Sequence, residues 1–154
     1  MGFTLIELLV TLAILSLVSL LSVNPFSRVL EYNNLNTSAI LLAKSIRMCQ
    51  NISMEEGVRT RILLDFVDNS YHLIKVEKLP RVFSTYYLGN DIVFSWTNFS
   101  KNIIEFDPVG CPDMRDVGTP DKGGTIAIKS KSNRYLYIIV TPVTGNVRIS
   151  ERPP

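Results

Sequence analysis

The sequence predicts an α+β fold in which one long N-terminal helix packs on antiparallel β-sheets. Three observations indicate this fold: a nearly uncharged apolar run at the start, a helical apolar stripe after it, and a series of short strand-like segments over the rest. With 154 residues the chain is long enough for one folded domain rather than two. A net charge of +2 and 46% hydrophobic residues exclude a disordered chain and a polytopic membrane protein, and disfavour a strongly electrostatic nucleic-acid binder.

The first element is an apolar run over residues 3–23 that contains nothing more polar than Thr, Ser and one Glu. As a helix it would be about 31 Å long, close to the hydrocarbon thickness of a bilayer. A cleaved secretory signal would need a basic region before the run, a shorter apolar core and a small-residue cleavage site. No Lys or Arg precedes this run, and Val23-Asn24-Pro25 is a poor cleavage site. We therefore expect a retained transmembrane helix over residues 3–24.

Glu7 is the one charged residue before Arg28. An ionised carboxylate in hydrocarbon costs several kcal/mol unless it has a partner. Because no Lys, Arg or His lies within helical reach on this chain, the sequence predicts a partner from another molecule. The alternative is a protonated Glu, or one that reaches the membrane interface and has no role.

Residues 2–10, Gly-Phe-Thr-Leu-Ile-Glu-Leu-Leu-Val, resemble the type IV prepilin signature. The resemblance implies that a prepilin peptidase cuts between Gly2 and Phe3 and methylates the new Phe3 amine. It also implies that Glu7 pairs with the Phe3 ammonium of a neighbouring subunit, which makes residues 3–24 an assembly helix as well. Residues 1–2 would be what remains of a leader. Leaders in this family are usually longer and basic. Breaking one side of a buried ion pair costs about 3–5 kcal/mol, so the pair would also set the axial register between subunits.

Pro25 stands directly after the apolar run. A proline inside a helix kinks or breaks it, and pilin-like proteins have one near this position, so we expect a helix kink at Pro25. The alternative is an ordinary helix end. Beyond it, an amphipathic helix is predicted over residues 25–57, ending at Gly57. Its apolar stripe recurs at alternating spacings of four and three residues: Leu35, Ala39, Leu42, Ile46 and Cys49.

Residues 58–154 are predicted to form a β-rich globular domain. Asp68-Asn69-Ser70 indicates a hairpin turn, and the Pro- and Gly-rich stretch 108–124 indicates a long loop. The candidate strands are Arg59–Val67, Tyr71–Lys78, Asp91–Ser95, Ile103–Phe106, Gly124–Lys129, Arg134–Thr141 and Val147–Ser150.

The globular part is similar to the H-type minor pseudopilins of type II secretion and to related minor pilins, over residues 42–58, 69–73, 123–128, 135–141 and 145–149. Competence pseudopilins of Gram-positive bacteria share this pilin-like architecture. The resemblance implies a non-enzymatic subunit of a type IV pilus or type II secretion filament, near the tip and priming assembly. Its implied partners are other pilins of the filament, the prepilin peptidase and an inner-membrane assembly platform. The implied location is the inner membrane, crossed once, with the C-terminal domain outside the cytoplasm.

No catalytic site, metal site or cofactor is predicted. The single histidine, His72, is expected on a sheet face, and two cysteines with one histidine at distant spacings make a poor zinc site. In an oxidising compartment Cys49 and Cys111 can form one disulfide, and the alternative is two free thiols.

Five basic residues fall on the C-terminal strands and their turn: Lys129, Lys131, Arg134, Arg148 and Arg152. Some related minor pilins bind DNA through a basic C-terminal region, which makes a DNA-binding minor pilin of a competence system the alternative function. A solvated strand face is favoured instead, because the net charge is small. A third interpretation is a monomeric membrane-anchored sensor domain.

Overall fold

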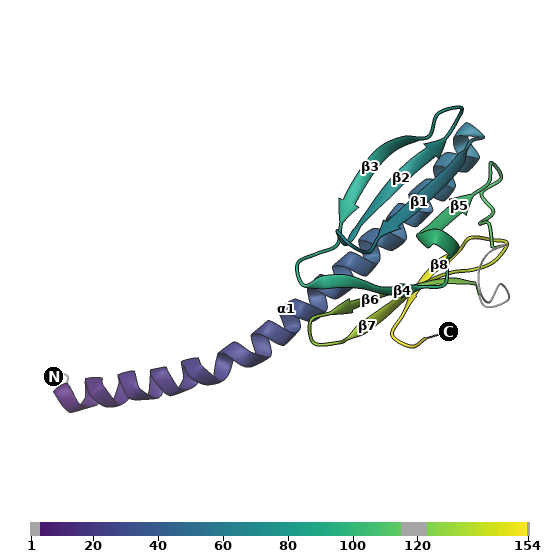
Figure 1. The fold of residues 1–154 in the computed structure, drawn as a ribbon. Helices are drawn as coiled ribbons and strands as arrows, with labels where there is room; N and C mark the ends of the chain where they lie inside the picture. The colour runs from purple at the N-terminus through teal and green to yellow at the C-terminus, as the bar shows by residue number, and fades with distance from the viewer. Residues whose placement is uncertain (1–3, 115–122, 154) are drawn as a thin grey trace.

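The computed structural model describes residues 4–114 and 123–153, and within the helix it describes no side chains for residues 20–26. It consists of one long helix, α1 (Leu5–Glu56), and two four-stranded antiparallel sheets that both pack on the C-terminal half of that helix (Figure 1). The N-terminal half of α1 extends away from the sheets. The predicted α+β architecture is therefore confirmed.

Helix α1 runs without interruption for 52 residues, about 78 Å at the usual rise. It passes through Pro25, so the alternative of a helix end at that position is wrong. The helix curves gently along its length (Figure 1), and a kink caused by Pro25 stays a prediction. It ends at Gly57, as predicted, where φ is +65° in the left-handed region that glycine adopts at low cost. Among the residues whose side chains are described, no helical stretch is both long and apolar enough to cross a membrane.

The first sheet, here called sheet A, has the strand order β3-β2-β1-β5. Its strands are β1 (Arg59–Asp65), β2 (Ser70–Val76), β3 (Arg81–Tyr87) and β5 (Ile103–Phe106). Asp65 caps the predicted hairpin turn between β1 and β2, because its carboxylate accepts hydrogen bonds from the amides of Val67 (2.8 Å) and Asp68 (3.2 Å). Strand β3 is an addition to the sequence prediction.

The second sheet, sheet B, has the order β4-β6-β7-β8. Its strands are β4 (Ile92–Thr97), β6 (Gly124–Ser130), β7 (Tyr135–Val140) and β8 (Val147–Ser150), and a short 3-10 turn, Ser100–Asn102, precedes β5. All four strands of sheet B overlap predicted segments, with ends that differ by at most two residues, and β8 has the predicted ends. A bulge between Phe94 and Trp96 shifts the register between β4 and β6.

The core lies between α1 and the inner faces of both sheets. All five predicted stripe residues of the helix, Leu35, Ala39, Leu42, Ile46 and Cys49, are completely buried. They share one apolar cluster with side chains such as Ile62 of sheet A and Ile126 of sheet B. Because removing a buried Leu or Ile side chain typically costs about 2–5 kcal/mol, this stripe fixes the domain to its helix.

Side-chain hydrogen bonds add to that attachment at both ends of the packed half. Near the end of α1, Arg47 Nη2 donates to the Val147 carbonyl (2.6 Å), and Gln50 Nε2 donates to the carbonyls of Gly110 (2.9 Å) and Thr144 (2.8 Å). Where α1 enters the domain, Glu31 Oε1 accepts from the Ser132 amide at 2.7 Å. Loops far apart in the sequence are thereby tied to one helix.

Candidate functional site

The candidate assembly segment begins at Thr4, which precedes the first turn of α1. Thr4 has an extended backbone, and its carbonyl accepts from the amides of Glu7 (3.1 Å) and Leu8 (3.2 Å). Glu7 therefore lies in the first helical turn, where the helix dipole favours a carboxylate. Its closest described polar contact is the Thr4 hydroxyl at 3.5 Å, which is long for a hydrogen bond. Within residues 4–114 and 123–153 no basic side chain pairs with Glu7.

Apolar side chains surround this carboxylate on every side of the helix. Leu5 and Ile6 are 80% and 70% exposed, and each of the other large apolar residues from Leu8 to Val18 exposes more than half of its surface. A helix that is apolar all round is normally found inside a large core or in a membrane. The segment thus presents a surface suited to burial against other apolar groups.

The hydroxyl groups of this segment are satisfied within the helix. Thr11 donates to the Leu8 carbonyl (2.9 Å), Ser16 to the Leu12 carbonyl (2.8 Å) and Ser19 to the Leu15 carbonyl (2.8 Å). Such bonds to the preceding turn remove the need for water, which suits an apolar environment. Glu7 is the ionisable side chain of this segment, and among the described residues it has only the long contact with the Thr4 hydroxyl. Gly2 and Phe3 lie outside the described residues, so cleavage and methylation there stay predictions.

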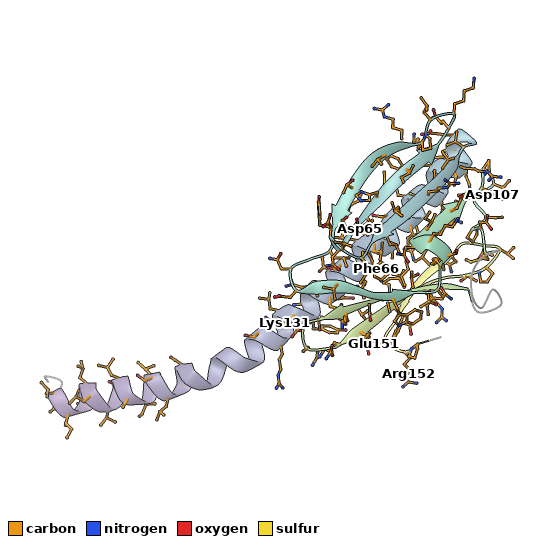
Figure 2. The ribbon with its side chains drawn as sticks, in the orientation of Figure 1. Asp65, Phe66, Asp107, Lys131, Glu151 and Arg152 are labelled. Carbon is orange, nitrogen blue, oxygen red and sulfur yellow. The ribbon has the colours of Figure 1, made fainter. Side chains whose placement is uncertain are left out.

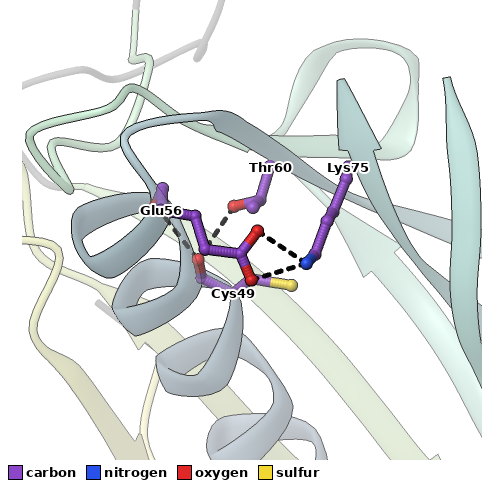
Figure 3. A network of polar contacts seen from close by, with 5 residues as sticks. Cys49, Glu56, Thr60 and Lys75 are labelled. Carbon is purple, nitrogen blue, oxygen red and sulfur yellow. Dashed lines mark hydrogen bonds and ion pairs between the residues drawn. The ribbon is translucent and has the colours of Figure 1, made fainter. Parts of the chain in front are cut away.

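The two cysteines are free thiols in the structure, which matches the alternative left open by the sequence rather than the disulfide. Cys49 is buried in the core, and this burial raises the pKa of its thiol to about 12. Its carbonyl accepts a hydrogen bond from the Thr60 hydroxyl at 2.9 Å, next to the ion pair of Glu56 and Lys75 (Figure 3). Cys111 is half-buried in a loop that the Asp107 carboxylate holds through the Cys111 amide at 2.8 Å. The helix thus points one thiol into the core while the other sits in a separately fastened loop.

His72 occupies a position on a sheet face, as expected. Its Nδ1 atom lies 2.9 Å from the hydroxyl of Thr85, its cross-strand neighbour on β3. In the part of the chain that the structure describes, no three His, Cys, Asp or Glu residues come together as a metal site.

The five basic residues lie on strands of sheet B, in the turn between β6 and β7, and after β8. Lys129 and Arg148 lie on β6 and β8. Lys131 borders a groove with Ser27 and Glu31 of α1, beside the helix where it enters the domain (Figure 2). Arg134 borders another groove near Tyr32 of α1, together with Glu151, the residue before Arg152. The DNA-binding alternative stays a prediction.

A row of aromatic rings on sheet B is a feature that the sequence reasoning missed. The row consists of Trp96, Tyr135 and Tyr137. The ring centroid of Tyr137 lies 6.2 Å from that of Trp96 and 6.3 Å from that of Tyr135. The spacing of Tyr135 and Tyr137 two residues apart on a strand could have indicated that they share a face. Trp96 joins them only through strand pairing that the sequence does not reveal.

Comparisons with known proteins agree with these observations. Residues 2–23 match the family described as the prokaryotic N-terminal methylation motif. No curated protein matches the chain in sequence. In structure, the chain is similar to the minor pseudopilin EpsH of the type 2 secretion system of Vibrio cholerae, with a TM-score of 0.61 and 9% identity over 76% of this chain and 96% of EpsH. It is also similar to the type IV minor pilin FimU of Pseudomonas aeruginosa, with a TM-score of 0.56 and 13% identity over 80% of this chain and 91% of FimU.

The motif match contains Glu7 and the apolar run, and the structural similarity extends over most of the chain. The resemblance inferred from the sequence is therefore supported by the N-terminal motif and by the fold. This chain carries a prepilin-type N-terminal methylation motif on a pilin-like fold, the fold of a minor pseudopilin and a type IV minor pilin.

Proposed function

We propose that this chain is a non-enzymatic structural subunit of a type IV pilus or type II secretion filament. The observation that carries the proposal is the unbroken α1, whose free half is apolar all round and has Glu7 in its first turn. In the proposed cycle the apolar half crosses the inner membrane once and the β-rich domain lies outside the cytoplasm. A prepilin peptidase removes residues 1–2 and methylates Phe3, and an assembly platform then inserts the subunit among other pilins.

The carboxylate would decide when a helix joins the filament. Helices in a bilayer gain no hydrophobic energy by leaving lipid for each other, so packing and polar pairing must supply the attraction. Among the described residues Glu7 has no ion-pair partner, and a neighbour's Phe3 ammonium would neutralise it. Because only one axial offset brings these two charges together, the same contact would fix the stagger between subunits.

A position near the filament tip, with a role in priming assembly, is part of the proposal. The fold likeness to two minor subunits supports it, since both are named as minor components. Deleting this chain would then reduce the number of filaments more than their length, and electron microscopy of sheared filaments measures both. An unchanged number of shorter filaments would contradict the priming role.

Mass spectrometry of the mature chain tests the processing step. In cells with an active prepilin peptidase we expect a chain that begins at Phe3 and carries one added methyl group. A peptidase-deficient strain is the control, and it should yield the unprocessed chain. A mature chain that still carries Met1 and Gly2 in the active strain would refute the proposal.

Replacing Glu7 tests the assembly step separately. We expect Glu7→Ala to be processed normally and to disappear from the filament fraction. Ser16→Ala is the matched control, because the Ser16 hydroxyl donates its hydrogen bond to the Leu12 carbonyl of its own helix. If Glu7→Ala assembles as well as the control, the monomeric sensor interpretation gains support and the filament proposal fails.

A further inference from the structure

The outer face of sheet B, on the side away from α1, carries the aromatic row Trp96, Tyr135 and Tyr137. Trp96 on β4 and Tyr137 on β7 both pair with Ala127 on β6, so one line of residues crosses three strands. The ring centroids of Trp96 and Tyr137 are 6.2 Å apart, and those of Tyr135 and Tyr137 are 6.3 Å apart with planes inclined by 13°. The ring of Tyr137 contacts both of the others, and the three rings form one apolar surface.

This surface is presented to solvent. Trp96 is 40% exposed and Tyr135 is 36% exposed, whereas Ala127 beneath the row is completely buried. Aromatic side chains are the residues that contribute most to protein interfaces, especially Trp and Tyr with Arg nearby. A row of three on one sheet face is therefore a stronger sign of a partner than a single exposed ring.

Two basic residues border the row along β7, one beside Tyr135 and one two residues beyond Tyr137. Lys129 is the cross-strand neighbour of Tyr135, and Arg148 is the neighbour of Ile139, four residues further along β7. The four strands of sheet B contain no Asp or Glu. Four residues along a strand and two strand spacings across place the two backbones about 16 Å apart. Ile139, beside Arg148, is itself buried. Along β7 the face is thus apolar in the middle, with one basic residue toward each side and no acidic residue on the strands of the sheet.

We propose that this face docks an acidic, extended segment of a partner protein. Apolar side chains of the segment would cover the aromatic row, and its carboxylates would meet Lys129 and Arg148. Because an extended chain advances about 3.3 Å per residue, the two carboxylates would be about five residues apart. Charge complementarity of this kind selects the partner and fixes its register.

A protein segment fits this face better than a nucleic acid. Two flanking cations neutralise few phosphates, and the chain as a whole has a net charge of only +2. A base inserted between two rings would need about 6.8 Å between their planes, twice the stacking distance. The row offers 6.2–6.3 Å between centroids, and its rings already contact each other.

The direction in which the face points rests on the proposed function. In a filament whose core is built from the helices, α1 faces inward, and the opposite face of sheet B faces away from the core. A partner outside the helix bundle can reach it there. The inference therefore concerns what the filament subunit contacts, and the proposed function concerns how it assembles.

Photo-crosslinking in the producing cells tests the docking surface with the full chain. Tyr137 is replaced by p-benzoylphenylalanine, and the adducts are mapped by mass spectrometry. Val82 on the edge strand β3 of sheet A is the control position, since it is 51% exposed and lies on the other sheet. We expect adducts from position 137 to converge on one protein segment with acidic residues about five apart, and no such convergence from position 82.

Charge reversal makes the test specific. Lys129→Glu combined with Arg148→Glu should reduce the adduct yield roughly tenfold, and reversing the two acids of the mapped segment should restore it. Unchanged Trp96 fluorescence shows that the variant is folded. Nuclease-sensitive adducts, scattered peptides without acidic groups, no adduct, or a yield unaffected by charge reversal would each overturn the inference. The processed N-terminus and the filament fraction are measured in the same cells, so a failure of docking is distinguished from a failure of assembly.

Discussion

Replacing Gly124 by alanine is expected to destabilise the globular domain, because the structure leaves no room for a methyl group there. A Cβ atom at this position would lie 1.8 Å from Cζ, 2.3 Å from Cε1 and 2.5 Å from Cε2 of Phe99. Carbon atoms make favourable contact at about 3.5–4.0 Å, so the ring would have to move by about 2 Å. Phe99 is only 4% exposed and belongs to the core cluster, so the movement would disturb its neighbours.

The magnitude has a lower and an upper bound. Inserting one carbon into a packed core usually costs about 1–3 kcal/mol, and losing the burial of a whole Phe ring costs about 3–5 kcal/mol. We expect a loss of about 3 kcal/mol for Gly124→Ala. Phe99→Ala removes the obstacle, so the double variant should be no less stable than Phe99→Ala alone. The two substitutions are then coupled by about 2 kcal/mol or more.

Guanidinium unfolding of the full chain in detergent micelles measures these differences. Trp96, the single tryptophan, reports on the state of sheet B through its fluorescence. Gly57→Ala is the matched control, because nothing lies within 4 Å of its added Cβ and only the positive φ opposes it. That control should lose about 1 kcal/mol, and Phe99→Ala should not relieve it. A wild-type midpoint for Gly124→Ala, or strictly additive losses with Phe99→Ala, would refute the packing argument.

Three further predictions concern the attachment of the helix. Because the pKa of Cys49 is raised to about 12, the folded chain keeps a proton that the unfolded chain releases, so the free energy of unfolding should fall as pH rises above about 9. This slope should be weaker in Cys49→Ala, and a maleimide at about pH 8, near the ordinary thiol pKa, should label Cys111 but not Cys49 in the folded chain. Gln50→Ala removes two hydrogen bonds to loop carbonyls and should cost about 1–2 kcal/mol in the same unfolding assay. Lys75→Met breaks a partly exposed ion pair with Glu56 and should cost no more than about 1 kcal/mol, an effect that about 1 M salt should largely remove.

The elements that sequence reasoning predicted correctly are those encoded locally. The stripe from Leu35 to Cys49 is visible as a helical period, and the structure buries all of it. Gly57 indicates the helix end through its own conformational freedom. The N-terminal methylation motif that contains Glu7 is equally local, because its residues follow one another at fixed spacing and need no tertiary contact to be identified.

The remaining features depend on contacts that no local pattern encodes. Strand β3, Arg81–Tyr87, is an edge strand with no fully buried position, so it lacks the alternation by which strands are predicted. Its place follows from pairing with β2. The pairings of β1 with β5 and of β4 with β6 join segments separated by long stretches of chain. Trp96 joins the aromatic row only because of the second of these pairings, so its place there could not be predicted from the sequence.

The uninterrupted course of α1 has a mechanical consequence. Tension applied to the N-terminal half of this helix is carried along one continuous backbone to the turns that contain Arg47 and Gln50. The helix is held there by the buried stripe and by hydrogen bonds to the carbonyls of Val147, Gly110 and Thr144. These contacts bear the tension in parallel, so they must break together rather than one after another. A load on the helix is thus shared by both sheets, and the domain travels with it as a single body.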